Sequence, residues 1–129
     1  MANPISKAMR TGTIGELLVQ LRLLQFGVQA AAPLKDSGND LVALKGTRCH
    51  TIQVKTTANG NLPAWPFPDK IYSLLAVVEL AGEDRDVFLD NSSVYLVPKH
   101  DLPQLERNWE SLHPYSMTGD LVDRFFAAD

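Results

Sequence analysis

The pattern of apolar and polar positions divides the chain into helical ends and a strand-rich middle. Eight of the thirteen residues from 14 to 26 are apolar, and with 3.6 residues per turn they fall on two stripes of a helix. A helix that is apolar on two sides packs between layers. Thr13 and Glu16 have the spacing of a capping box at its start, although the helix could begin as early as Ser6. Gly27 predicts its end.

Short apolar runs separated by turn residues predict the strands. Two of them, residues 41–44 and 49–56, are joined by a segment that contains Gly46, which favours a tight hairpin. The prolines and asparagines of residues 58–69 predict a loop. The expected elements are strands at 28–32, 41–44, 49–56, 71–80, 86–89 and 94–97, and helices at 101–112 and 119–126.

Size and composition indicate one globular domain. The chain has 129 residues, of which 45% are hydrophobic and 21% charged, which excludes a disordered protein. The single cysteine, Cys49, excludes an intrachain disulfide and a cysteine-cluster metal site. The longest mostly apolar stretch, residues 71–81, is too short to span a bilayer, and no secretory signal is visible. We therefore expect one cytoplasmic α/β domain over residues 1–129, with no membrane partner.

The charge balance changes along the chain. The net charge is −3, which by itself does not favour nucleic-acid binding. Residues 1–60 carry seven basic and three acidic side chains, whereas residues 61–129 carry five basic and twelve acidic ones. This asymmetry is consistent with one side that faces a polyanion and another that faces solvent. Chance clustering in a short chain explains it equally well.

Several common motifs are absent from the sequence. It contains no GxGxxG, GxxxxGK[ST], HExxH or GxSxG segment. The three histidines, His50, His100 and His113, are too widely scattered to indicate a zinc site. We expect them to be ordinary strand or surface residues.

Candidate chemistry lies on the expected hairpin. Gln53 and Lys55 are two residues apart and therefore share one face of a strand. A turn centred on residues 46–47 places Asp40 opposite Gln53, where directly opposed residues share a face. A carboxylate, an amide and an amine that converge in this way are rarely needed for packing alone. Glu16 lies in a polar seam of the first helix and is a candidate fourth member, with the capping box as its alternative role.

These residues resemble the PD-(D/E)XK nuclease superfamily. Gly-Glu on the first helix, then SGNDLV and IQVKTT, are similar to Holliday-junction-resolvase-like and small restriction-endonuclease-like members over residues 12–57. The resemblance implies a restriction-endonuclease-like αβββαβ core, which is a mixed sheet with a central β-hairpin flanked by helices. In this comparison Glu16 matches the helix-borne acid and Asp40 the motif aspartate. Gln53 and Lys55 match the (E/D)xK pair.

Two positions depart from the family's pattern. Asn39 stands where the proline would be, and Gln53 replaces the usual carboxylate. An amide oxygen can bind a hard cation but adds no charge, so Glu16 and Asp40 would have to supply the negative charge for Mg²⁺ or Mn²⁺. By the resemblance, the backbone carbonyl of Val54 is a further metal ligand.

The implied reaction is Mg²⁺-dependent endonucleolytic hydrolysis of DNA, including branched or foreign DNA, in repair, recombination or restriction; RNA is not excluded as substrate. Lys55 would orient the attacking water or stabilise charge on the phosphate. Symmetric cutting of two strands needs two active centres, so we expect a homodimer. The candidate nucleic-acid contacts are Lys35, Lys45, Arg48, Thr56, Thr57, Trp65 and Phe67.

Other interpretations remain open for these contacts and for the whole protein. Trp65 and Phe67 could anchor their loop in the core, and strand propensity alone accounts for the two threonines. The chain could also be a catalytically weak or inactive nuclease-fold module that binds nucleic acid or a protein. A third interpretation is an interaction protein, such as an immunity or toxin-associated subunit, that docks through its acidic C-terminal half.

Overall fold

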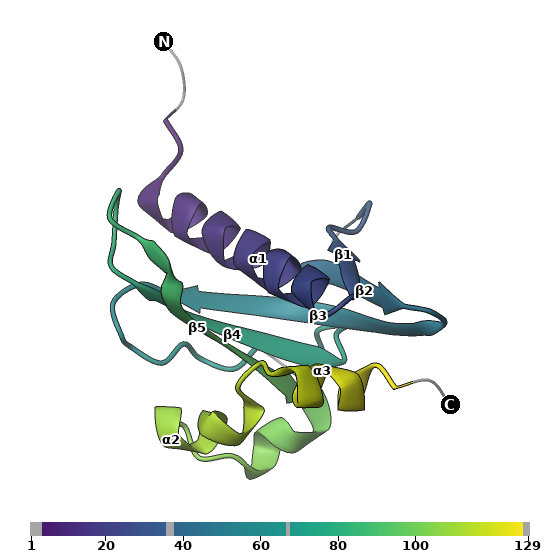
Figure 1. Ribbon diagram of the computed structural model, residues 1–129. Helices are drawn as coiled ribbons and strands as arrows, with labels where there is room; N and C mark the ends of the chain where they lie inside the picture. The colour runs from purple at the N-terminus through teal and green to yellow at the C-terminus, as the bar shows by residue number, and fades with distance from the viewer. Residues whose placement is uncertain (1–3, 36–37, 67, 128–129) are drawn as a thin grey trace.

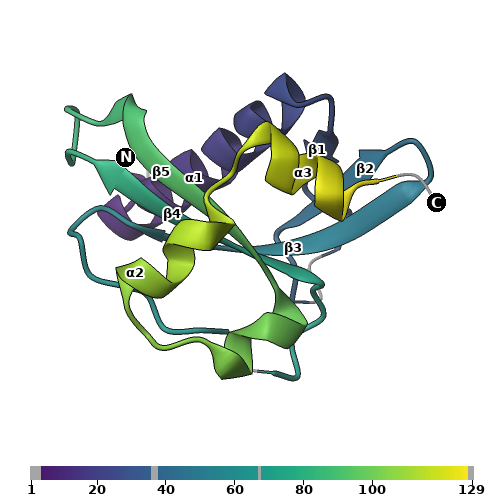
Figure 2. The ribbon, with the colours of Figure 1, turned by 60° about the horizontal axis from the view of Figure 1, so that its bottom comes forward.

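A five-stranded sheet organises the molecule, with helices on both of its faces (Figures 1 and 2). The structure is a computed structural model and describes residues 4–35, 38–66 and 68–127. Neighbouring strands are antiparallel except β3 and β4, which are parallel. The strands, in both chain and spatial order, are β1 (Gln29–Ala31), β2 (Leu41–Lys45), β3 (Arg48–Thr57), β4 (Leu74–Ala81) and β5 (Phe88–Pro98). The predicted α/β class, with a mixed sheet and a central hairpin, is confirmed.

Helix α1 (Lys7–Gln25) begins earlier than the capping box predicts. Its N-cap is Ser6, whose side chain accepts a hydrogen bond from the backbone N–H of Met9 at 3.1 Å. Glu16 therefore lies inside the helix, and its capping-box role is wrong. The end of the helix is as predicted, because Gly27 adopts the left-handed conformation with φ of 81°.

Only one side of α1 is covered. Leu18, Val19 and Leu23 are buried against the sheet, whereas Leu17 and Leu21 are 57% and 51% exposed. The prediction that this helix packs between two layers is therefore wrong. The reason is that α3 lies beside α1 on the same sheet face and does not lie over it (Figure 2).

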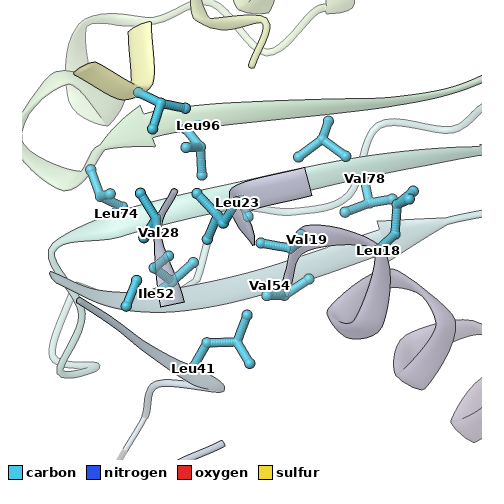
Figure 3. Close-up of a cluster of buried hydrophobic side chains, with 14 of the residues drawn as sticks. Leu18, Val19, Leu23, Val28, Leu41, Ile52, Val54, Leu74, Val78 and Leu96 are labelled. Carbon is cyan, nitrogen blue, oxygen red and sulfur yellow. The ribbon is translucent and has the colours of Figure 1, made fainter. Parts of the chain in front are cut away.

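Two hydrophobic cores lie on opposite faces of the sheet. In β4 the five residues 74–78 are all buried, and alternate side chains enter alternate cores. The first core joins the sheet to α1 and α3, and the second joins it to the segments that follow β5. Figure 3 shows the first core, which includes Leu18, Val19 and Leu23 of α1, Ile52 and Val54 of β3, Leu74 and Val78 of β4, and Leu96 of β5.

The strands expected at 86–89 and 94–97 are one continuous strand, β5. The polar residues 90–93 in its middle predict a break between two strands. In the structure, the pairing of β5 with β4 continues and only shifts its register between Glu79 and Ala81. The buried Ser92 side chain bridges this irregularity, because its Oγ accepts from the N–H of Ala81 at 2.9 Å and donates to the carbonyl of Phe88 at 3.0 Å. The strand therefore continues where the sequence favours a turn.

The helix expected at 101–112 is interrupted. A 3₁₀ helix, η1 (Lys99–Gln104), contains Pro103, and a separate short helix, α2 (Trp109–Leu112), begins after Asn108. Asn108 Oδ1 accepts from the N–H of Ser111 at 2.8 Å, which makes Asn108 the N-cap of a new helix. The last elements are η2 (His113–Tyr115) and α3 (Gly119–Phe125), the latter at its predicted position.

The connection from β3 to β4 differs from the αβββαβ order that the resemblance implies. Among the described residues of this connection, 58–66 and 68–73, the structure contains no helix. Its prolines lack the N–H groups that a helix needs, as the prediction of a loop at 58–69 anticipates. Trp109 Nε1 fastens the loop by donating to the carbonyl of Gly60 at 2.9 Å.

Charges that are separated along the sequence meet in the fold. Basic residues of the first half pair with acidic residues of the second half, so the two halves do not form separate basic and acidic sides here. The pairs are Lys7–Glu83 (3.5 Å), Lys7–Asp84 (3.6 Å), Arg10–Asp84 (3.3 Å) and Lys45–Asp123 (3.5 Å). Among residues 4–35, 38–66 and 68–127, moreover, no helix has the length and apolar character needed to cross a membrane.

Candidate active site

The β2–β3 hairpin has the register that its turn residues predict. Leu41 pairs with Ile52, and Lys45 pairs with Arg48 across the turn. Asp40 and Gln53 come together in consequence, and Gln53 Nε2 donates a hydrogen bond to Asp40 Oδ2 at 2.9 Å. The hairpin therefore brings a carboxylate and an amide into direct contact.

The Asp40 side chain also replaces a backbone partner of β3. Its Oδ2 accepts from the N–H of Val54 at 2.8 Å, while its own N–H donates to the carbonyl of Ile52 at 2.8 Å. The N–H and C=O of one residue point to the same edge of an extended strand. The Val54 carbonyl is thus directed to the edge of β3 where the Asp40 carboxylate lies.

Lys55 lies on the face of β3 that carries Gln53. Ile52 and Val54 belong to the first core, so strand alternation places Gln53 and Lys55 on the opposite face. Lys55 is half-buried, and its amine makes no hydrogen bond or ion pair with the described residues. A lysine ammonium in this position is a compact positive charge near the Asp40 edge.

Helix α1, which carries Glu16, packs closely on β3. Gly15 is buried, and a Cβ at position 15 would overlap Thr56 Oγ1 and lie 2.8 Å from Thr56 Cβ. The glycine therefore permits the close approach, and the half-buried Glu16 follows it directly in the helix. The apolar pattern alone does not predict this role of Gly15, although a glycine inside a helical pattern is itself a sign of close packing.

A matched pair of glycine variants tests this approach. Gly15→Ala is expected to lower the free energy of unfolding by about 1–3 kcal/mol, because the added methyl group overlaps Thr56. Gly12→Ala, in the same helix, meets nothing within 4 Å and is expected to raise it by about 0.5–1 kcal/mol. Urea denaturation measures both values. Equal effects of the two variants would show that α1 does not need a glycine at position 15.

The donor set suits a hard divalent cation. Among the described residues, no three His, Cys, Asp or Glu side chains are grouped closely enough to hold a metal ion. The oxygens at this edge come instead from the Asp40 carboxylate, the Val54 carbonyl and the Gln53 amide, whereas Glu16 belongs to α1, which covers the face of β3 opposite Gln53 and Lys55. Mg²⁺ prefers oxygen ligands, keeps several waters and needs only one or two carboxylates, so these residues fit such an ion.

Two of the basic residues predicted to contact nucleic acid lie far from the Asp40 edge. Lys45 and Arg48 flank the turn at the far end of β2, about 17 Å away at 3.3 Å per residue. There they fasten the hairpin to the C-terminal segment: Lys45 Nζ lies 3.5 Å from Asp123, and Arg48 Nε donates to the carbonyl of Ala127 at 3.2 Å. Lys35 is exposed.

The remaining predicted contacts are largely turned inward. Thr56 Oγ1 is buried beside Gly15 without a hydrogen-bond partner among the described residues. Thr57 is buried, and its hydroxyl donates to Asn59 Oδ1 at 2.6 Å. Trp65 packs against the second core, which supports its alternative role as a loop anchor. Phe67 lies outside the described residues.

Comparisons with known proteins found little. No family model matches the chain, and no curated protein matches it. A solved structure of a bacterial homing endonuclease is similar over 75% of this chain and 72% of that chain, with 17% sequence identity and a TM-score of 0.45. A match at that level carries no inference about activity.

Proposed function

We propose that the protein is a metal-dependent endonuclease whose active site is the Asp40 edge of β3. The observation that carries this proposal is the contact of Asp40 with both the Gln53 amide and the Val54 N–H. That contact holds a carboxylate, an amide and a strand carbonyl at one edge, with Lys55 on the adjoining strand face. Asp40, Gln53 and Lys55 therefore belong to one hairpin, and the assignment of Glu16 on α1 rests on the motif resemblance.

The side chains have separate roles in the proposed hydrolysis. Asp40, Glu16 and the Val54 carbonyl would hold Mg²⁺ or Mn²⁺, which when bound supplies an activated water and neutralises charge on the phosphate. The hydrogen bonds from Val54 and Gln53 fix the Asp40 carboxylate in place. The Lys55 ammonium stabilises the charge that develops on the phosphate oxygens.

DNA is the proposed substrate, and a homodimer is the proposed active form, since two centres are needed to cut both strands of a duplex symmetrically. The proposed setting is cytoplasmic, in repair, recombination or restriction. The resemblance of the motif at Asp40, Gln53 and Lys55 to nuclease motifs supports DNA as the substrate.

A second candidate is a nuclease-fold module without catalysis. It is favoured by the hydrogen bond from Gln53 to Asp40, which satisfies one carboxylate oxygen without a metal ion. The third interpretation, docking through acidic C-terminal residues, loses support because Glu83, Asp84 and Asp123 pair with basic residues of the same chain.

Cleavage assays on single-stranded, duplex and branched DNA and RNA separate the two candidates. We expect cleavage of DNA in Mg²⁺ or Mn²⁺ and none in EDTA, together with a rise in melting temperature when Mg²⁺ is added. The wild-type protein with Ca²⁺ serves as a control for cation binding without hydrolysis. If no substrate is cut and no cation stabilises the fold, the endonuclease proposal is wrong.

A further inference from the structure

A pocket of about 610 Å³ lies away from the Asp40 edge, between the turn-proximal part of β3, α3 and the segment η1–η2. In Figure 2, α3 lies beside this end of β3. Leu74 at the start of β4, the preceding Ser73, and Pro98 at the end of β5 close it. None of Glu16, Asp40, Gln53 and Lys55 lines it, so it is a separate feature of the molecule.

Its lining carries two guanidinium groups. Arg48 and Arg124 contribute them, and Arg48 also donates through Nε to the Ala127 carbonyl at 3.2 Å. Asp101, an acidic lining residue, is engaged inside the pocket, since it accepts from the Tyr115 hydroxyl at 2.9 Å and lies 3.2 Å from His100 Nε2. Guanidinium donors on two walls of one pocket suit an anion.

Tyr115 keeps its proton in this arrangement. Burial, and then the hydrogen bond to Asp101, raise the pKa of Tyr115 above its ordinary value of 10.0, and only the Arg124 charge opposes the shift. The hydroxyl thus remains a donor to Asp101 and adds no negative charge to the pocket. Arg124 and Tyr115 both line the pocket.

His50 is held in the pocket wall by two contacts. Its Nε2 donates to the Phe125 carbonyl at 2.8 Å and must carry the hydrogen, because a carbonyl only accepts. Its Nδ1 lies 2.9 Å from Ser73 Oγ, which also lies 3.2 Å from the Thr51 carbonyl. These contacts fix the ring between Ser73 and α3.

We propose that this pocket binds a phosphate group of the nucleic-acid substrate, outside the cleavage site. The inference rests on the proposed function for the nature of the ligand. Planar guanidinium groups match phosphate oxygens in pairs, and Arg48 and Arg124 reach the pocket from two different elements. The pocket and Lys55 are roughly 20 Å apart along β3, which corresponds to about six base pairs of duplex.

Arg124→Gln tests the pocket, because Arg124 is exposed on α3 and its loss does not open the core. Arg85→Gln is the matched control, since it removes the same charge from the exposed turn between β4 and β5. Duplex oligonucleotide binding is measured by fluorescence anisotropy in EDTA across a salt series. We expect Arg124→Gln to weaken binding about 5–10-fold and to reduce the slope of log K against log salt by about one, with no change for Arg85→Gln. Equal effects of both substitutions, or none, would overturn the proposal.

A test with inorganic phosphate shows whether the phosphate group that the pocket binds belongs to nucleic acid or to a free phosphate compound. Melting temperatures in phosphate and in chloride at equal ionic strength are compared for the wild type and Arg124→Gln. Stabilisation by phosphate that needs Arg124, combined with unchanged oligonucleotide binding, would assign the pocket to a free phosphate compound and reject the nucleic-acid assignment. Cleavage assays judge the proposed function separately. If the protein cuts DNA but Arg124→Gln binds the oligonucleotide as well as the wild type, only the phosphate-pocket proposal is refuted. If Arg124→Gln weakens oligonucleotide binding but the wild type cuts no substrate, only the endonuclease proposal is refuted.

Discussion

Lys55→Ala and Asp40→Asn are each expected to reduce metal-dependent cleavage by about 10²–10³-fold or more, with little loss of stability. Lys55→Ala removes the positive charge beside the phosphate. Asp40→Asn removes the carboxylate charge that binds the cation, but its amide oxygen can still accept from Val54 and Gln53 at the positions of the present bonds. Initial rates on a DNA substrate in Mg²⁺ measure the effect.

The choice of asparagine at position 40 matters. The sequence pattern suggests that Asp40 faces outward and that alanine would leave the fold intact. The structure contradicts this, because Asp40→Ala leaves the Val54 N–H without its acceptor, at a cost of about 1–3 kcal/mol if that group stays buried. Melting temperatures of all three variants are the control, and wild-type cleavage rates in Lys55→Ala or Asp40→Asn would rule out this active-site assignment.

Gln53→Glu is expected to increase the affinity for Mg²⁺ by about tenfold or more, because a second carboxylate then faces Asp40 at the distance of the present 2.9 Å hydrogen bond. Isothermal titration calorimetry measures the affinity. Cleavage should persist or increase, since the cation and Lys55 offset the added charge. The matched control is Gln104→Glu, which adds the same charge at an exposed position of η1.

Without a cation, the same variant should be less stable at neutral pH. Two carboxylates in contact raise the pKa of one of them above its unfolded-state value, so the folded state binds a proton more tightly than the unfolded state. Stability is then retained at acid pH and lost as pH rises through the raised pKa. Melting curves from pH 5 to 8, with and without about 5 mM Mg²⁺, record this. A loss at neutral pH that Mg²⁺ does not repair would favour the inactive module.

The hairpin could be predicted from the sequence, whereas the boundaries around it could not. Gly46 and the alternation on either side fix the register, because a shift of one residue would expose Ile52 and Val54. The start of α1 stays ambiguous in the sequence, because Thr13 and Glu16 imitate a capping box inside a helix that begins after Ser6. The polar residues between 89 and 94 predict two strands in place of one, since sequence patterns do not show that the Ser92 hydroxyl group will bridge an irregular ladder.

Part of the candidate site could be predicted from the sequence, because the register of the hairpin alone brings Asp40 to Gln53. The register does not reveal that β2 begins only at Leu41, so that the carboxylate of the preceding Asp40 accepts from the Val54 N–H in place of a backbone carbonyl. The pocket near Arg124 was not foreseen, because its residues come from five separate segments and depend on tertiary packing.

The parallel pairing of β3 and β4 has a consequence for the order of folding. The β2–β3 hairpin is local and can form within about 1–10 μs. Parallel pairing must first close the long connection between β3 and β4, which is slower because loop entropy is lost before contacts are gained. We therefore expect the contact between Asp40 and Gln53 to form early, on a β2–β3 hairpin that has not yet paired with β4. The pocket that contains Ser73 and Arg124 is completed only when the C-terminal helix docks.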